Sequence, residues 1–406
     1  MLWILASVAI ALLSYEIWTL ATAVLIPLLS NPNALQTDFH YYYAAAQRFA
    51  ADPNQLYSTG DDVIAGFAYP PPAILPFVAL TSMPLGMALA LTTLASYAAL
   101  LVASIQWLRY LDRHGIRTDR ASTLAILLIA GALGPSYMNA IFGQVNAFVL
   151  ASAVAFAALT EAMPLVAGLM LALGGWLKLY PALMIWTGAW DRTAWRAIGY
   201  AAAAALIVGM VSLFWIPAGA YGMFASFVLP SRSGTTAIHV TNQSLVAFLE
   251  RFRFEPGLFL HWTGQQAVTV SGAVTAINIG LLIAMLGMLM KIGRAPHRTA
   301  HAAATLMAMV AVVAPLGWGH TYVMALPLVI LALIEMRNAR TAHAALTSGC
   351  VVALMIPAGR HLPLDTLPSW LQNVAYSRYL IATIVLVAIS TSPREKTAGS
   401  AAIARA

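Results

Sequence analysis

The chain has 406 residues, of which 61% are hydrophobic and only 9% are charged, and its mean hydropathy is +0.80. Such a composition, with repeated apolar runs of about 20 residues, excludes an ordinary soluble enzyme and indicates a polytopic α-helical membrane protein. The net charge of +7 is explained by membrane topology rather than by a nucleic-acid partner, and the single Cys350 excludes an internal disulfide.

We expect an all-α protein with about twelve transmembrane helices. The first segment has no basic leader and is too long for a signal-peptide core, so we expect it to be retained. Glu16 lies in the middle of this segment, and we expect it to be structural, either paired with another buried polar group or neutral. The expected segments are 3–29, 84–108, 121–135, 143–160, 164–177, 179–190, 197–217, 269–290, 301–315, 321–335, 342–358 and 375–392.

Basic residues divide the connections between these segments into two sets. One set, with the C-terminal tail, holds 14 of the 21 Lys and Arg residues, whereas the other seven are spread over much longer loops. The positive-inside rule therefore predicts that both termini are cytoplasmic and that the long loops face outward from the cell membrane. The 14 residues are Arg109, Arg113, Arg117, Arg120, Arg192, Arg196, Lys291, Arg294, Arg298, Arg337, Arg340, Arg394, Lys396 and Arg405.

The polar residues gather in the predicted outer loops. The first loop, 30–84, contains Thr37-Asp38-Phe39-His40 followed by three tyrosines, and the stretch 39–50 is typical of an amphipathic helix in the membrane interface. The run Tyr69-Pro70-Pro71-Pro72 predicts an extended entry into the next helix. The remaining outer polar residues are Gln144 and Asn146 in a short turn, Asn242, Gln243 and Arg251 in the second long loop (218–268), His320 in another turn, and Arg360, His361 and Asp365 in a third loop.

The chain has no internal repeat and no low-complexity linker, so we expect one membrane-embedded domain over 1–406. Within it we expect a catalytic module at about 1–217 and a variable helical module at about 218–392. Residues 393–406 are expected to form a cytoplasmic tail.

Two charged residues are candidates for chemistry. Asp38 has two roles open to it, because an Asp before an aromatic helical run is a good N-cap, and a carboxylate beside a His and tyrosines is also a candidate base. Lys178 lies between two apolar runs, where a lysine either snorkels from a helix end or faces a polar cavity and binds a lipid phosphate.

These residues form an ordered series. It runs through Asp38-Phe39-His40-Tyr41, Leu56-Tyr57, Tyr69-Pro70-Pro71, Gly143-Gln144-Val145-Asn146, Leu177-Lys178-Leu179-Tyr180-Pro181, Asn242-Gln243-Ser244-Leu245 with Arg251, and Trp318-Gly319-His320. The series resembles the polyprenol-phosphate-mannose-dependent mannosyltransferases of glycosyltransferase family 87, in the GT-C superfamily. The N-terminus departs from members that carry a long basic leader, and beyond about residue 335 only hydropathy matches.

The resemblance implies a GT-C fold whose long first outer loop contains interfacial helices and a catalytic Asp, here Asp38. It implies an inverting enzyme that moves a hexose, mannose first among the candidates, from a polyprenyl-phosphate donor to a hydroxyl of a glycolipid or glycan. Asp38 would be the general base, Lys178 and His320 would lie near the donor phosphate or the acceptor, and no metal or other cofactor is expected. The further candidate substrate-binding residues are His40, Tyr69, Gln144, Asn146, Asn242, Gln243 and Arg251.

Two other classes of protein remain open from the sequence. A transporter or flippase is common among proteins with about twelve transmembrane helices, but many transporters have an internal repeat and polar groups near the membrane midplane. A scaffold without catalysis leaves Asp38 and Lys178 unexplained. The glycosyltransferase is the hypothesis that accounts for both residues.

Overall fold

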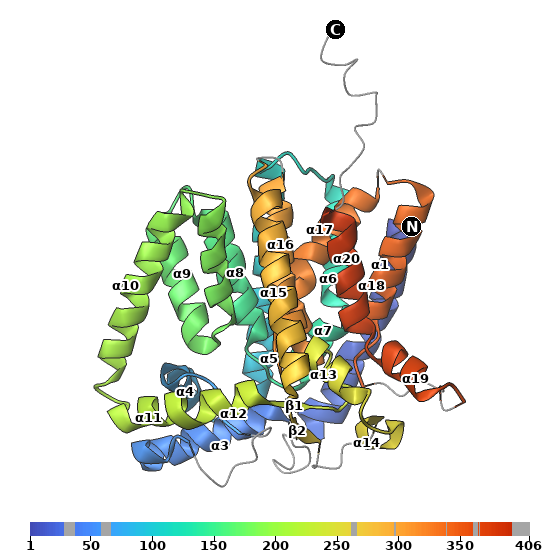
Figure 1. Ribbon diagram of the computed structural model, residues 1–406. Coiled ribbons are helices and arrows are strands. Elements are labelled where there is room, and N and C mark those ends of the chain that lie inside the picture. The colour runs from blue at the N-terminus through green and yellow to red at the C-terminus, as the bar shows by residue number, and fades with distance from the viewer. Residues whose placement is uncertain are drawn as a thin grey trace.

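The computed structural model describes residues 1–27, 37–57, 66–260, 266–295, 298–337, 339–359, 364 and 366–391. Over these residues the chain is almost entirely helical, as expected for the all-α class. Long helices run side by side as a bundle, and shorter helices lie across one end of it, at the bottom of Figure 1. We call this end of the bundle the site end.

The bundle contains most of the apolar segments. Its elements are α1 (Leu2–Thr19) with the π-helical turn η1 (Leu20–Leu25), α5 (Leu85–Arg113), α6 (Arg120–Gly131), α7 (Gly134–Ile141), α8 (Asn146–Leu159), α9 (Pro164–Leu177), the 3₁₀ helix η4 (Tyr180–Ala189), α10 (Ala194–Ser212), α15 (Gly272–Gly293), α16 (Thr299–Val313), the 3₁₀ helix η7 (Gly319–Ala325), α17 (Leu326–Met336), α18 (Thr341–Met355) and α20 (Arg378–Thr391).

Among the described residues, five helices are long and apolar enough to cross a membrane, or up to seven if two bent pairs each count as one span. The bent pairs are α6 with α7, at 49°, and α19 (Ser369–Tyr376) with α20, at 65°. The chain is thus a multi-pass membrane protein, but the expected count of twelve is not confirmed. Several expected segments are apolar helices of 10–17 residues, and the segment expected at 179–190 is the 3₁₀ helix η4.

Burial separates a central helix from peripheral ones. The helix formed by η7 and α17 is 94% buried inside the protein, whereas α15 is only 17% buried. A helix that is apolar all round and enclosed by protein belongs to the core, and an apolar helix that is mostly uncovered faces lipid. Gly319, which begins this central helix, therefore lies in the buried core of the bundle.

The site end is built from the two long loops of the sequence (Figure 1). The first contributes α3 (Asp38–Ala51), which confirms the helix expected at 39–50, and two short 3₁₀ turns, η2 (Pro53–Gln55) and η3 (Pro71–Ala73). Pro70 is extended as predicted, with φ −53° and ψ 148°, but it leads into a helix that the sequence did not indicate, α4 (Ile74–Leu80).

The second long loop is also largely ordered. It forms α11 (Ala218–Met223), the π-helical turn η5 (Phe224–Val228), α12 (Leu229–Gly234), β1 (Thr235–Ala237), α13 (Leu245–Arg251), α14 (Pro256–Leu260) and β2 (Ala267–Thr269). The two strands pair antiparallel, with Thr236 opposite Val268. α3 and the α11–α12 segment lie across the ends of the bundle helices in Figure 1.

The opposite end of the bundle carries the basic connections. Those between α5 and α6, between α15 and α16 and between α17 and α18 lie there together with the N-terminus (Figure 1). Glu16 is buried in α1, and neither of its carboxyl oxygens has a hydrogen-bond partner in the described part of the chain. The expected tail at 393–406 and residues Arg360, His361 and Asp365 lie outside the described residues.

Candidate active site

A cavity of about 640 Å³ lies at the site end of the bundle. Its walls include five of the residues singled out from the sequence, which come from five separate segments of the chain. These are Asp38, Tyr69, Gln144, Lys178 and His320.

Asp38 is the first residue of α3, and the N-cap is the preceding residue, Thr37. The Thr37 N–H donates to Nδ1 of His40 at 3.1 Å, so the His40 ring completes the cap. The N-cap role that was open for Asp38 therefore belongs to Thr37, and His40 is not part of the cavity wall. A carboxylate in the first helical turn is favoured by the helix dipole, which leaves Asp38 ionisable and fixed in position.

A glycine allows α3 to approach the bundle closely. Gly143 has φ +62°, and a Cβ built on it would lie 2.7 Å from the Cβ of Phe39. A hydrogen bond from the Phe39 N–H to the Phe142 carbonyl, at 3.1 Å, joins the start of α3 to the end of α7 at this point. A residue with a side chain would strain the backbone and push α3 away. Gly143 thus brings Asp38 within reach of the next residue, Gln144.

Lys178 lies in the turn between α9 and η4, outside both segments. Pro181 follows in the first turn of η4 and cannot continue α9, so the chain turns here. α9 is held tightly against α8, because a Cβ on Gly174 would lie 1.9 Å from the Ser152 hydroxyl. The lysine side chain is buried, with Nζ 5.0 Å from the ring centre of Tyr69. This is a lysine facing a polar cavity, not one that snorkels to a surface.

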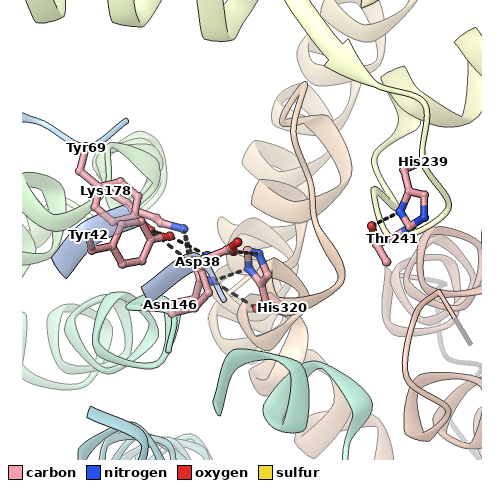
Figure 2. A network of polar contacts seen from close by, with 9 residues as sticks. Asp38, Tyr42, Tyr69, Asn146, Lys178, His239, Thr241 and His320 are labelled. Atoms are coloured by element: carbon pink, nitrogen blue, oxygen red, sulfur yellow. Dashed lines mark hydrogen bonds and ion pairs between the residues drawn. The ribbon is translucent and has the colours of Figure 1, made fainter. Parts of the chain in front are cut away.

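Lys178 fixes the orientation of two amide side chains (Figure 2). Its Nζ lies 3.2 Å from Oε1 of Gln144 and 2.8 Å from Oδ1 of Asn146. An ammonium group only donates hydrogen bonds, so both amide oxygens must face it and both NH₂ groups must point away. The NH₂ group of Gln144 then donates to Oδ2 of Asp38.

The second amide sets the tautomer of His320. The NH₂ group of Asn146 lies 2.8 Å from Nδ1 of His320, so Nδ1 accepts and the proton of a neutral ring sits on Nε2. Nε2 faces Oδ2 of Asp38 at 3.6 Å. The order Lys178, Asn146, His320, Asp38 is therefore a chain of contacts in which each group orients the next.

Two tyrosines close the other side of this network. The hydroxyl of Tyr69 lies 2.6 Å from that of Tyr42 and 3.0 Å from Oε1 of Gln144. Burial raises the pKa of both tyrosines well above the ordinary value, so both stay neutral. Tyr42 also accepts from the Gln144 NH₂ group at 2.7 Å, which holds that amide in the orientation Lys178 requires.

Burial brings the pKa values of Asp38 and Lys178 closer together. It raises the pKa of Asp38, against the lowering effects of the Gln144 hydrogen bond and of the cations Lys178 and Arg232. It lowers the pKa of Lys178 to about 7, against the raising effect of Asp38. The Asp38 side chain is 38% exposed, but it faces the cavity. A carboxylate whose pKa is raised toward neutrality is a better general base than an ordinary one.

Arg232 and His239 also line the cavity, although the sequence reasoning did not select them. Arg232 lies in α12 and is close enough to Lys178, Tyr69 and Asp38 to affect the pKa of each. Its signal in the sequence was weak: it is one of seven basic residues in the predicted outer loops, and it follows the apolar run 224–229.

Asn242, Gln243 and Arg251 lie near the cavity but do not line it. Arg251 is buried and fully engaged: Nε donates to Oδ1 of Asn373 and Nη2 to Oγ of Ser377, both at 2.7 Å, and Nη1 donates to the Asn242 carbonyl at 2.8 Å. Gln243 donates to the Tyr376 carbonyl at 2.7 Å. Their contacts hold the second long loop to α19 and α20, and any contact with substrate stays a prediction.

The described residues include no group of three or more His, Cys, Asp or Glu side chains that could hold a metal ion. The charged groups that line the cavity in this part of the chain are Asp38, Lys178 and Arg232, with the two histidines His239 and His320. Such a set can take a proton, hold an anion and orient a hydroxyl group.

Comparison with known proteins identifies the family. The model of glycosyltransferase family 87 matches residues 67–316, more than half of the chain. The match includes Tyr69, Gln144 and Lys178, whereas Asp38 and His320 lie outside it. No curated protein matches the chain. The resemblance seen in the ordered motifs is confirmed, and the chain belongs to glycosyltransferase family 87, a family of membrane glycosyltransferases.

Proposed function

We propose that this glycosyltransferase moves a hexose, mannose first among the candidates, from a polyprenyl-monophosphate donor to a hydroxyl group of a glycolipid or glycan. One observation carries the proposal: an oriented carboxylate, Asp38, shares a cavity with two cations, Lys178 and Arg232. The carboxylate can serve a hydroxyl nucleophile, and the cations can serve a phosphate leaving group.

In the proposed reaction the acceptor oxygen attacks C1 of the donor sugar, and its proton passes to Asp38. The bond between C1 and the phosphate oxygen breaks, and its electron pair stays on the polyprenyl phosphate. Attack opposite the leaving group inverts the configuration at C1. A positioned base contributes about 10²–10⁴-fold to such a step, and cations aimed at the developing phosphate charge lower the barrier further.

Lys178 has a double role in this proposal. Two of its three N–H bonds are directed at Gln144 and Asn146, so it orients the groups that hold Asp38 and His320. Its positive charge also acts on the donor phosphate, together with that of Arg232 in α12.

The apolar part of the cavity supports a lipid-linked donor. Leu179, Phe224, Val228 and Leu229 line it on the side of η4 and of the α11–α12 segment. Leu179 and Leu229 are also 45% and 43% exposed, so neither is covered by protein. A polyprenyl chain could pass between them into the bilayer while its phosphate meets Lys178 and Arg232.

We further propose that the site end faces outward from the cell membrane and that the termini are cytoplasmic. The basic connections at the opposite end of the bundle support this orientation (Figure 1). Substitution Asn54→Cys, in a chain carrying Cys350→Ser, should react with an impermeant maleimide added to intact cells. Labelling of this cysteine only after lysis would show that the site end faces the cytoplasm and would contradict the proposed orientation.

The donor is tested with the purified chain in lipid nanodiscs. We expect labelled product from polyprenyl-phosphoryl-[³H]mannose and a crude glycolipid extract, and none from a nucleotide-linked mannose. The product of a β-linked donor should be an α-mannoside. Transfer from the nucleotide sugar, or retention of configuration, would refute the proposal. No observation in the described residues favours the transporter, whose polar groups are expected near the midplane and not at one end of the bundle.

A further inference from the structure

The cavity has a second polar region that the proposed reaction does not use. His239, Thr241 and Trp318 line it, and Nδ1 of His239 lies 2.5 Å from the Thr241 hydroxyl. In Figure 2, His239 and Thr241 lie on one side of Asp38 and His320, whereas Lys178, Tyr42 and Tyr69 lie on the other. Asp38 therefore lies between the region that contains Lys178 and the region that contains His239 and Thr241.

Two loops that are hydrogen-bonded to each other form this side of the cavity. We call residues 239–244 and 314–319 the paired-loop wall. Asn242 and Trp318 pair as an antiparallel β-bridge, the Gln243 N–H donates to the Gly317 carbonyl at 2.9 Å, and the Gly319 N–H donates to the Thr241 carbonyl at 2.8 Å. These bonds join the loop that carries His239 to the loop that leads into η7, where His320 lies.

Asn242 and Arg251, two candidate substrate-binding residues of the second long loop, form hydrogen bonds that hold this wall together. The NH₂ group of Asn242 donates to the Ala237 carbonyl at 2.9 Å and the Pro315 carbonyl at 3.2 Å. Arg251 donates from Nη1 to the carbonyls of Asn242, at 2.8 Å, and His239, at 3.3 Å. Buried groups that are hydrogen-bonded in this way hold a loop in one conformation, so the side chains on the cavity face of the wall are positioned before any ligand binds.

The ring of His239 has a defined tautomer. Its Nδ1 accepts the backbone N–H of Thr241 at 3.3 Å and lies 2.5 Å from the Thr241 hydroxyl. A neutral imidazole that accepts at Nδ1 carries its proton on Nε2, so the N–H group of the ring lies at the position away from Thr241. Such a donor suits a hydroxyl or ring oxygen.

The wall is also uncharged. Its described residues in the cavity lining are His239, Thr241, Ala314, Pro315, Leu316 and Trp318, which include no Asp, Glu, Lys or Arg. An uncharged surface that combines an indole ring with fixed hydrogen-bonding groups suits a neutral sugar, because the ring packs against C–H groups while the polar groups meet hydroxyls. A phosphate is better served on the side of Lys178 and Arg232.

We propose that His239, Thr241 and Trp318 form the subsite that binds a neutral sugar of the acceptor and presents its hydroxyl to Asp38. This inference rests on the proposed function, in which Asp38 takes the proton of that hydroxyl. It assigns the acceptor to the paired-loop wall and the donor to the region of Lys178 and Arg232, with Asp38 and His320 between them.

The test separates acceptor kinetics from donor kinetics. The chain in nanodiscs receives polyprenyl-phosphoryl-[³H]mannose as donor and octyl α-mannoside as acceptor probe. Loss of one uncharged hydrogen bond or one packed ring should raise the acceptor KM about tenfold in His239→Ala and Trp318→Ala. The donor KM and the slow hydrolysis of donor by water should stay within about twofold of wild type. His239→Gln keeps an N–H donor and should recover part of the loss.

Trp370→Ala is the matched control, because Trp370 is an exposed indole of the site end that does not line the cavity. Unchanged acceptor KM in both cavity variants, or an equal rise in donor KM and fall in hydrolysis, would overturn the subsite. If the wild-type chain transfers no sugar from the donor, the proposed function fails. Calorimetric binding of octyl α-mannoside then decides the subsite: weaker binding in Trp318→Ala supports it, and equal binding overturns it.

Discussion

Replacing Lys178 with methionine tests whether this lysine both orients Gln144 and Asn146 and supplies a positive charge for catalysis. Methionine has a similar length and no charge, so the change removes two hydrogen bonds, to Gln144 and Asn146, and one cation beside the donor. The loss of one preorganised group that stabilises developing charge costs about 10²–10³-fold in kcat. We therefore expect kcat to fall at least about 100-fold, which corresponds to roughly 2.7 kcal/mol in the activation barrier.

The stability of the same variant should change little. Removing Lys178 leaves the Asn146 oxygen without its donor, at a cost of about 1–3 kcal/mol. It also relieves the desolvation of a buried ammonium group, which is of similar size and opposite sign. We expect the free energy of unfolding in detergent to stay within about 2 kcal/mol of the wild-type value. Large loss of activity with small loss of stability is the signature of a functional lysine.

The dependence of kcat on pH should also change in a defined direction in Lys178→Met. In the wild-type chain, activity should rise with pH as Asp38 ionises, at a pKa above that of an ordinary Asp, and should fall as Lys178 loses its proton at about 7. Lys178 lowers the pKa of Asp38, so in Lys178→Met the rising limb should move to higher pH and the falling limb should disappear. The assay is kcat against pH with labelled donor, and Lys291→Met, in the last turn of α15 and outside the cavity lining, is the control. Activity within about threefold of wild type, or an unmoved rising limb, would refute the reasoning.

Three other variants or treatments follow from the same geometry. His320→Ala removes the Nε2–H group that faces Asp38 and should lower kcat/KM about tenfold to 100-fold; kinetics of this variant equal to wild type would remove His320 from the site. Gly143→Ala should push α3 away from Gln144 and lower both thermal stability and kcat, whereas Gly222→Ala, where a Cβ has open space, should do neither. Chelator treatment should leave transfer unchanged; a loss that added divalent metal restores would show that a metal assists.

Much of the site could be predicted from the sequence because its chemistry depends on residue types that are rare in an apolar chain. Asp38, Lys178 and His320 stood out as polar groups at the ends of apolar runs, and the structure brings all three to one cavity. The helix at 39–50 was also predictable as an amphipathic interfacial helix, but the cap considered for Asp38 lies one residue earlier, at Thr37.

Other features depend on contacts between distant segments and had no local signal. The orientation of Gln144 and Asn146 follows from the position of Lys178, which no spacing rule provides. Arg232 becomes a site residue only because α12 lies across the end of the bundle.

The number of membrane spans was not predictable for a related reason. Hydropathy identifies apolar segments, but an apolar segment can be short when neighbouring helices bury it, as they do α16. The pattern also cannot distinguish an α-helix from the 3₁₀ helix η4, which begins beside Pro181.

The central claim is that Asp38 takes the proton of the acceptor hydroxyl, and Asp38→Asn tests it most directly. The amide keeps the size of the carboxylate but cannot accept that proton, whereas Asp52→Asn changes a carboxylate of the same loop that does not line the cavity. We measure single-turnover transfer from polyprenyl-phosphoryl-[³H]mannose, and donor affinity separately. We predict a rate at least about 100-fold lower in Asp38→Asn, with donor affinity retained and Asp52→Asn unchanged. A rate in Asp38→Asn within about threefold of wild type would contradict the account.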